Sequence, residues 1–136
     1  MNFKTLTGAT RRVSKPKKYL IKWKHKSKSK IQFRVKEFLE PYWGDHIVFE
    51  EFPVAGSRLT FDFYNANKKI AVEVQGAQHL KYVPFFHGPS RSKFLQQIRR
   101  DQDKVEFCKL NNITFVEIFP DDEISRSIFE SQGVFL

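Results

Sequence analysis

Two short segments, residues 58–64 and 69–75, constrain the fold of this chain more than any other feature. In each, large apolar residues alternate with polar or small ones, which is the pattern of a β-strand with one face on a core. The residues between them, 65–68, are Asn-Ala-Asn-Lys, which favour a turn. The sequence therefore predicts a β-hairpin, which places the side chains of two strands beside one another.

Further elements follow from the same kind of pattern. The sequence predicts a helix from Ser29 that ends at Pro41, a turn over 42–45, a strand over 46–52, a helix over 92–110, a strand over 113–119, and a short final helix after 121–123. We expect Phe94, Ile98, Val105 and Cys108 to form the buried face of the second helix. This order indicates a single α/β (α+β) domain with a central mixed four-stranded sheet flanked by helices.

Charge is distributed unevenly along the chain. Residues 1–36 contain thirteen Lys or Arg and no Asp or Glu, whereas the remaining hundred contain eleven basic and fifteen acidic residues. We therefore expect a basic N-terminal arm, residues 1–28, attached to a domain formed by residues 29–136. An arm of this charge indicates a polyanionic partner, of which DNA is the leading candidate and RNA the second. A membrane partner is disfavoured because the arm has no clear amphipathic helix.

Cysteine content and hydropathy limit the setting. The single cysteine, Cys108, excludes an intrachain disulfide and a multi-cysteine zinc site. No long apolar run predicts a transmembrane helix, and the N-terminus has no secretion-signal pattern. We expect an intracellular protein, in the cytoplasm of the host cell if a phage encodes it.

Two acidic residues fall on the predicted hairpin. Asp62 lies between Phe61 and Phe63 on the first strand, and Glu73 precedes Val74 on the second. Side chains alternate between faces along a strand, so Glu73 and Gln75 point the same way. Two carboxylates on neighbouring strands repel one another unless a cation lies between them, and oxygen ligands suit Mg²⁺. An ordinary solvent-facing strand remains the alternative for either acid taken alone.

These motifs together resemble the PD-(D/E)XK nuclease superfamily. The resemblance runs from about Ser29 to Phe119 and rests on Phe61-Asp62-Phe63, Glu73-Val74-Gln75-Gly76-Ala77-Gln78-His79, Asp101-Gln102-Asp103-Lys104, Phe107-Cys108 and Asn111-Asn112-Ile113. It is greatest for the branch of very-short-patch-repair-like (EDxHD) phage homing endonucleases. The resemblance implies a metal-dependent endodeoxyribonuclease that hydrolyses phosphodiester bonds with Mg²⁺, which Mn²⁺ can replace.

The resemblance assigns roles to individual residues. Asp62 and Glu73 would bind the metal, His79 would act on the attacking water, and Asp101 would orient His79. Gln75 stands where the superfamily usually has a lysine, and glutamine can bind the water but brings no positive charge. Lys81, Lys69 or a second metal ion could supply that charge.

The first helix should contribute a glutamate in the resembling branch. Spacing assigns that position to Gln32, whereas chemistry favours Glu37, which lies about 140° further around the helix. The sequence leaves both assignments open.

Nucleic-acid contacts are expected from two regions, the basic arm and the loop at 81–92. The lysines that alternate from Lys22 to Lys30 suit an extended segment along a phosphate backbone, and Arg11-Arg12 suits a minor groove. The full expected set is Arg11, Arg12, Lys15, Lys17, Lys18, Lys22, Lys24, Lys26, Lys28, Lys30, Lys81, His87, Arg91, Lys93 and Lys104. A charged tail that only aids solubility is the alternative for the arm.

The sequence supports two leading hypotheses. The first is a phage-type homing or nicking endonuclease that acts on double-stranded DNA, in which double-strand cleavage would require a homodimer or two successive nicks. The second is a catalytically degenerate nuclease-fold protein that binds DNA or RNA, which the Gln32 and Gln75 departures favour.

Overall fold

The computed structural model describes residues 1–76 and 89–136, with the side chains of the second stretch described from residue 95. Its elements are β1 (Asn2–Lys4), β2 (Thr10–Arg12), the 3₁₀-helix η1 (Pro16–Tyr19), α1 (Lys30–Trp43), β3 (Val48–Pro53), β4 (Thr60–Asn65), β5 (Ile70–Val74), α2 (Pro89–Leu110), β6 (Thr114–Ile118) and α3 (Arg126–Glu130). No helix among the described residues is long and apolar enough to cross a membrane.

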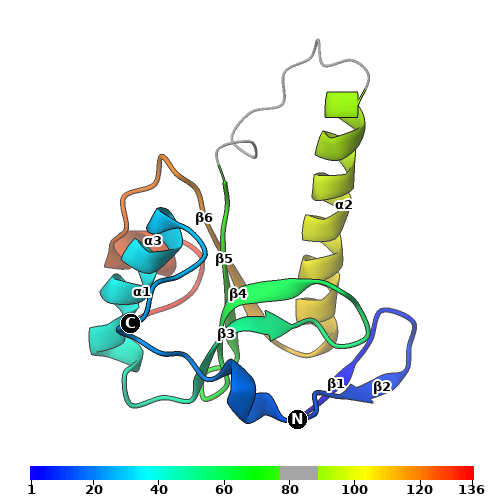
Figure 1. Ribbon diagram of the computed structural model, residues 1–136, viewed down its shortest axis with the longest axis horizontal. Coiled ribbons are helices and arrows are strands. Elements are labelled where there is room, and N and C mark those ends of the chain that lie inside the picture. Colours follow the sequence, from blue (N-terminus) through cyan, green and yellow to red (C-terminus); the bar gives the residue numbers. More distant parts are fainter. Residues whose placement is uncertain (77–88) are drawn as a thin grey trace.

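A four-stranded mixed sheet forms the centre of the molecule (Figure 1). The strand order is β3-β4-β5-β6, in which the first three strands are antiparallel and β6 runs parallel to β5. The predicted hairpin is β4-β5, with Asn65 paired to Ile70 across its turn. The mixed α+β architecture predicted from the sequence is confirmed at this level.

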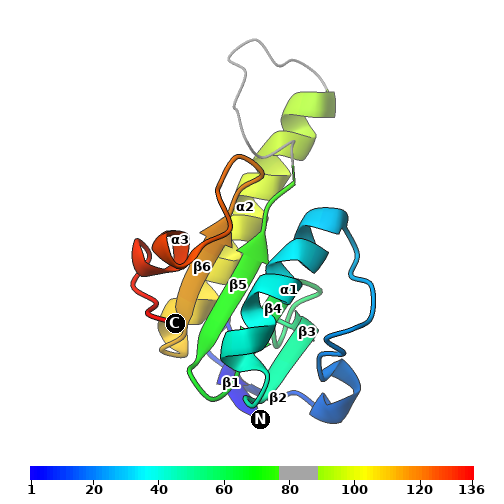
Figure 2. The same ribbon diagram turned by 90° about the vertical axis from the view of Figure 1, so that its left-hand side faces the viewer.

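The two faces of the sheet carry separate hydrophobic clusters. On one face, α1 and α3 pack against the sheet through residues such as Leu39 and Phe129 (Figure 2). On the other face, Phe107 of α2 and Phe3 of β1 pack against aromatic residues of β3 and β4, with the Phe3 and Phe107 ring centroids 5.6 Å apart. Helices and the N-terminal hairpin thus cover both faces.

The basic N-terminal segment is folded against the sheet. Phe3 and Val13 are buried, and the main chain continues to the edge of β3, where the Ile21 amide donates to the Val48 carbonyl at 3.0 Å. Burying two apolar residues stabilises this attachment by roughly 3 kcal/mol or more. Residues 1–28 therefore contribute to the hydrophobic packing of the sheet, and their lysines project from a folded surface.

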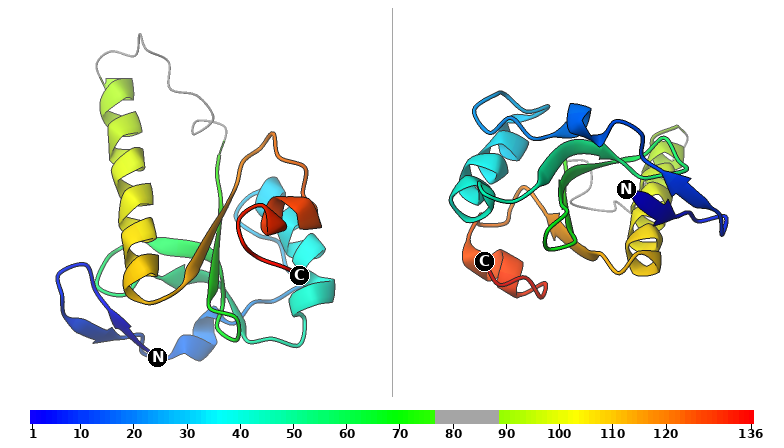
Figure 3. Two further views of the ribbon diagram at one scale, coloured as in Figure 1. Left: turned by 180° about the vertical axis from the view of Figure 1, so that it is seen from behind. Right: turned by 90° about the horizontal axis from the view of Figure 1, so that it is seen from below.

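Two details of the helix predictions are wrong. Pro41 lies inside α1, and the predicted turn at 42–45 begins only after Trp43, because Trp43 extends the buried stripe of Val35 and Leu39 by one more turn. Among the α2 side chains that the structure describes, from residue 95 on, Lys104, Phe107 and Cys108 are buried, which confirms the expected burial of Cys108. Val105 is only partly buried, Ile98 is 39% exposed, and the side chain of Phe94 lies outside the described residues. The N-terminal half of α2 projects beyond the sheet (Figures 1 and 3), so the described strands offer little surface for Ile98 to pack against.

Candidate active site

Asp62 and Glu73 lie beside one another on the central strands. Phe63 of β4 pairs with Val72 of β5, and Asp62 and Glu73 are each one residue further toward the open end of that pair. Both carboxylates are buried, with only 2% and 7% of their surface exposed. The hairpin register therefore gathers two negative charges in one water-poor place, which is costly without compensation.

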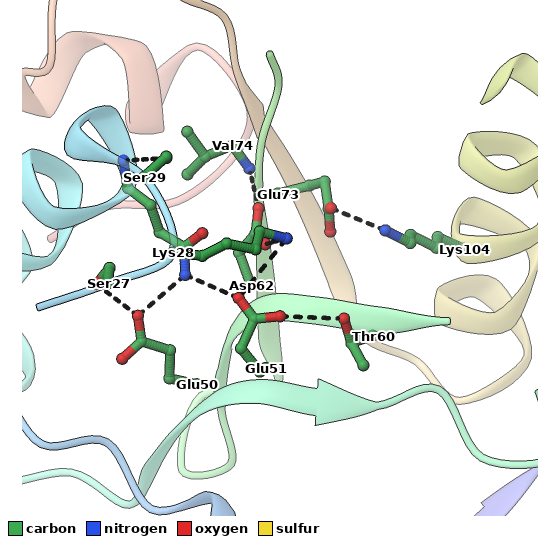
Figure 4. A network of polar contacts seen from close by, with 11 residues as sticks. Ser27, Lys28, Ser29, Glu50, Glu51, Thr60, Asp62, Glu73, Val74 and Lys104 are labelled. Atoms are coloured by element: carbon green, nitrogen blue, oxygen red, sulfur yellow. Dashed lines mark hydrogen bonds and ion pairs between the residues drawn. The ribbon is translucent and has the colours of Figure 1, made fainter. Parts of the chain in front are cut away.

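The two carboxylates are only partly compensated. The Asp62 Oδ2 atom accepts a hydrogen bond from the Val74 amide at 2.7 Å, and Glu73 Oε1 accepts one from Lys104 Nζ at 2.8 Å (Figure 4). The second oxygen, Glu73 Oε2, is buried and has no hydrogen-bond partner among the described residues. A buried polar atom without a partner is uncommon in a folded protein, and a carboxylate oxygen so placed could coordinate a cation.

The pKa values of the two carboxyl groups reflect this incomplete compensation of their charge. Burial, and then repulsion from Asp62, raise the pKa of Glu73 to about 8, although Lys104 opposes the shift. Burial also raises the pKa of Asp62, against the opposing effects of the Val74 amide and Lys28. Perturbed carboxylates in a cleft are a recognised signature of functional sites.

Lys104 occupies a different place from the one expected. Lys104 was expected to contact DNA, but its side chain is only 10% exposed and forms a buried ion pair with Glu73. A signal for this was present, because Lys104 is three and four residues before the core residues Phe107 and Cys108 and so shares their helix face. Lys69, by contrast, lies in the β4-β5 turn, at the opposite end of β5 from Gln75, and does not line the cleft.

A second set of polar residues adjoins Asp62. Lys28 Nζ lies 3.6 Å from Asp62 Oδ1 and 3.8 Å from Glu51 Oε1. Glu51 has a left-handed backbone conformation, with φ of 53°, within β3. Such a conformation costs on the order of 1 kcal/mol or more in a non-glycine residue, and it tends to occur at functional sites.

The structure distinguishes the two candidates on the first helix. Gln32 is buried and lines the cleft, where its Nε2 donates to Glu50 Oε2 at 2.9 Å and to Glu51 Oε1 at 3.1 Å. Glu37 is exposed and does not line the cleft. Gln32 is therefore the helix residue at this place. The network continues to the buried Lys36, whose Nζ is 2.8 Å from Glu50 Oε1.

Gln75 lines the same cleft but is hydrogen-bonded elsewhere. Its Nε2 donates to Glu117 Oε2 on β6 at 3.0 Å, and the side chain is buried. Glu117 was not anticipated, because only the parallel pairing of β5 with β6 brings it alongside Glu73. A glutamine held in this way can present its oxygen to the cleft while its amide nitrogen is occupied.

These side chains surround a cleft of about 570 Å³. Asp62 and Glu73 line it together with Gln32, Gln75, Lys28, Arg58, Arg100 and Lys104. Asp101 accepts a hydrogen bond from Gln97 at 3.1 Å and lines a different hollow, between α2 and Glu117. The expected partner of Asp101, His79, lies outside the described residues, as do Lys81, His87 and the side chains of Arg91 and Lys93.

The ten basic residues expected in the arm are all exposed: Arg11, Arg12, Lys15, Lys17, Lys18, Lys22, Lys24, Lys26, Lys28 and Lys30. Lys18, Lys22, Lys26 and Lys28 line a second hollow, of about 280 Å³. Lys28 lines both this hollow and the cleft, so the basic surface leads directly to Asp62.

The donor set limits which metal ion the cleft would suit. Within residues 1–76 and 95–136, no three His, Cys, Asp or Glu side chains are grouped closely enough to bind a metal together. Two carboxylates with one unpartnered oxygen instead fit Mg²⁺, which binds through one or two carboxylates and keeps several waters.

Sequence comparison finds partial relatives in viruses. Uncharacterized protein 307L of Invertebrate iridescent virus 6 is 40% identical over 60 residues, which is 44% of this chain and 30% of that protein. Uncharacterized protein 094L of Frog virus 3 (isolate Goorha) is 36% identical over 66 residues, 48% of this chain and 43% of that protein. The matches thus span less than half of each relative. No protein-family model matches the chain, and no solved structure matches it.

Proposed function

We propose that this protein is a metal-dependent endodeoxyribonuclease that hydrolyses phosphodiester bonds in double-stranded DNA, with Mg²⁺ or Mn²⁺ as cofactor. One observation carries the proposal: two buried carboxylates on adjacent strands share a cleft, and one of their oxygens, Glu73 Oε2, has no partner among the described residues. The motif resemblance to phage-type homing and nicking endonucleases of the PD-(D/E)XK superfamily supports the same activity.

In this proposal Asp62 and Glu73 hold the metal. A bound Mg²⁺ would polarise the phosphate and lower the pKa of a coordinated water. The Val74 amide orients Asp62 through its 2.7 Å hydrogen bond, so the carboxylate is fixed before any ligand arrives. Burial excludes bulk water from the pair, which strengthens its attraction for a cation.

Lys104 supplies the positive charge that Gln75 lacks. Its ammonium reaches Glu73 from α2 at 2.8 Å, so a lysine charge is present in the cleft although it comes from another element. There it can stabilise negative charge that develops on the phosphate. Gln75, whose amide nitrogen is bound to Glu117, accepts a hydrogen bond from the attacking water.

Plasmid nicking tests the proposal. Purified protein with Mg²⁺ or Mn²⁺ should convert supercoiled DNA to the nicked form, and Asp62→Asn and Glu73→Gln should each abolish this conversion. Glu37→Gln is the matched control, because Glu37 is an exposed carboxylate outside the cleft and should leave nicking unchanged. Nicking that persists in both cleft variants would reject the proposed site.

A second candidate is a nuclease-fold protein that binds nucleic acid without cutting it. The observation that favours it is that Glu73 is already neutralised by Lys104, while Gln32 and Gln75 are engaged in hydrogen bonds. This candidate predicts tight binding of duplex DNA, or tighter binding of structured RNA than of duplex DNA. It predicts no cleavage with either Mg²⁺ or Mn²⁺. Competition between DNA and RNA of equal length distinguishes the two ligands.

A further inference from the structure

Three exposed basic residues from three separate elements lie at the rim of the cleft. Lys28 comes from the segment before α1, Arg58 from the β3-β4 turn, and Arg100 from α2. All three are exposed, whereas Asp62 and Glu73 at the same cleft are buried. The cleft therefore has negative charge inside and positive charge at its edge.

The two arginines differ from the two lysines of the cleft in their partners. Lys28 and Lys104 form ion pairs with Asp62 and Glu73, respectively. Neither Arg58 nor Arg100 has a hydrogen-bond or ion-pair partner in the part of the chain that the structure describes. An unpaired guanidinium keeps its five donors and its full charge for a ligand, and its planar fork matches a phosphate group.

Helix geometry directs Arg100 toward the cleft. Gln97, Arg100 and Lys104 all line it, and their spacing of three and four residues puts them on one stripe of α2. Arg100 therefore lies one turn before Lys104 along the helix, toward its projecting end. Arg99 is also exposed but is rotated about 100° from Arg100 and does not line the cleft.

We propose that Arg58 and Arg100 bind the phosphates that neighbour the one positioned at Asp62 and Glu73. The DNA backbone would then follow the rim of the cleft, with one arginine from the β3-β4 turn and one from α2 fixing its register. This inference rests on the proposed function, because it takes DNA as the ligand of the cleft. It adds two contacts, outside the basic arm, that position the substrate for cleavage.

The test is the salt dependence of DNA binding without divalent cations, so that cleavage cannot occur. Fluorescence anisotropy with a duplex of about 20 base pairs, from roughly 50 to 200 mM salt, gives the slope of log K against log salt. Each lost phosphate contact should make that slope less negative by about 0.9. Arg58→Ala and Arg100→Ala should each show this change, and the double variant about 1.8.

Two matched variants control for the loss of charge alone. Arg99→Ala removes an exposed arginine from the same helix, and Arg34→Ala removes one from α1, and neither residue lines the cleft. Both should retain the slope of the unaltered protein. Unchanged slopes in Arg58→Ala or in Arg100→Ala, or an equal change in Arg99→Ala, would overturn the inference. Thermal unfolding of each variant verifies that these surface changes leave the protein folded.

The result is separable from that of the proposed function. If the slopes change as expected but no variant or condition yields nicking, the arginines bind DNA and the nuclease proposal fails. If the protein nicks DNA through Asp62 and Glu73 while the slopes stay constant, the nuclease proposal stands and this inference fails.

Discussion

Replacing Lys104 by methionine should destabilise the protein in a way that depends on pH. The substitution keeps a long unbranched side chain, one atom shorter, but removes the ammonium that lies 2.8 Å from Glu73 Oε1. Both side chains are only 10% exposed, so the remaining carboxylate would be left buried without its cation. Removing one partner of a buried pair typically costs about 3–5 kcal/mol of unfolding free energy.

The pH sets how much of that cost appears. The pKa of Glu73 is raised to about 8, chiefly by burial and by Asp62. At pH 9 the carboxylate of the unaltered protein is largely charged, whereas Glu73 of the variant can take up a proton at a cost of about 1.4 kcal/mol for the one pH unit above its pKa. The loss at pH 9 should therefore exceed the loss at pH 6 by about 1 kcal/mol, which is less than the full cost of an unpaired buried charge. At pH 6 Glu73 is largely protonated, and the loss should fall below about 1 kcal/mol.

Urea unfolding at the two pH values measures this difference, with the fluorescence of Trp23 and Trp43 as the signal and a chelator present to exclude metal. Lys109→Met is the matched control, because Lys109 pairs with Glu106 at 3.4 Å on the exposed side of the same helix. It should lose less than about 1 kcal/mol at both pH values. Equal losses for Lys104→Met at pH 6 and pH 9, or a loss no greater than the control's, would refute the reasoning.

Three further predictions follow from the same structure. Phe3→Ala should lower the unfolding free energy by about 3–5 kcal/mol in chemical denaturation, because Phe3 is buried in the core. The control Leu6→Ala should lower it by less than about 1 kcal/mol, because Leu6 is exposed. Similar losses in the two variants would mean that the N-terminal hairpin is not attached to the sheet. The metal-free protein should lose stability as pH rises from about 4.5 to about 8, because folded Glu73 retains its proton over this window while the unfolded chain releases it. Glu73→Gln should make that part of a Tm-against-pH profile less steep, with the remaining slope due to Asp62, whose pKa is also raised. An unchanged slope in Glu73→Gln would contradict the assignment. In plasmid nicking, Lys104→Met should slow cleavage by roughly 100-fold or more and Gln75→Ala by less, because Lys104 brings a positive charge beside Glu73 and Gln75 brings none. The reverse order would return the main role to Gln75.

The strands were the most predictable part of the fold. The alternation around Asp62 and Glu73 and the turn at 65–68 determine the hairpin locally, so its register follows from neighbouring residues. The ends of α1 were harder to predict, because Pro41 argues locally for a stop and only the burial of Trp43 in the folded protein outweighs it. Rules based on neighbouring residues cannot predict the free energy gained by burying Trp43, because that burial depends on the folded protein.

The candidate site was predictable in its carboxylates but not in its surroundings. Glu117, Glu50 and Glu51 reach the cleft through strand pairings that join distant parts of the chain, and no local pattern specifies those pairings. Lys104 is an intermediate case, because its position beside Phe107 and Cys108 on one helix face indicates burial, although Glu73 as its partner follows only from the fold.

The basic arm shows how composition can mislead about structure. Thirteen positive charges with no acid in residues 1–36 led to the expectation of a basic arm attached to a separate domain. Phe3 and Val13 nevertheless attach this segment to the sheet. The burial of a few apolar residues stabilises the attachment, and the lysines do not oppose it because their charged ends remain in water.

The most direct test of the account is the position of a divalent cation in a crystal grown with Mn²⁺, located by its anomalous scattering. The account predicts one peak between Asp62 and Glu73, with a carboxylate oxygen of each within roughly 2.0–2.5 Å and with Glu73 Oε2 among the ligands. Asp62→Asn crystals should lose that peak. A cleft in which Lys104 still neutralises Glu73 and no Mn²⁺ lies near either carboxylate would contradict the central claim.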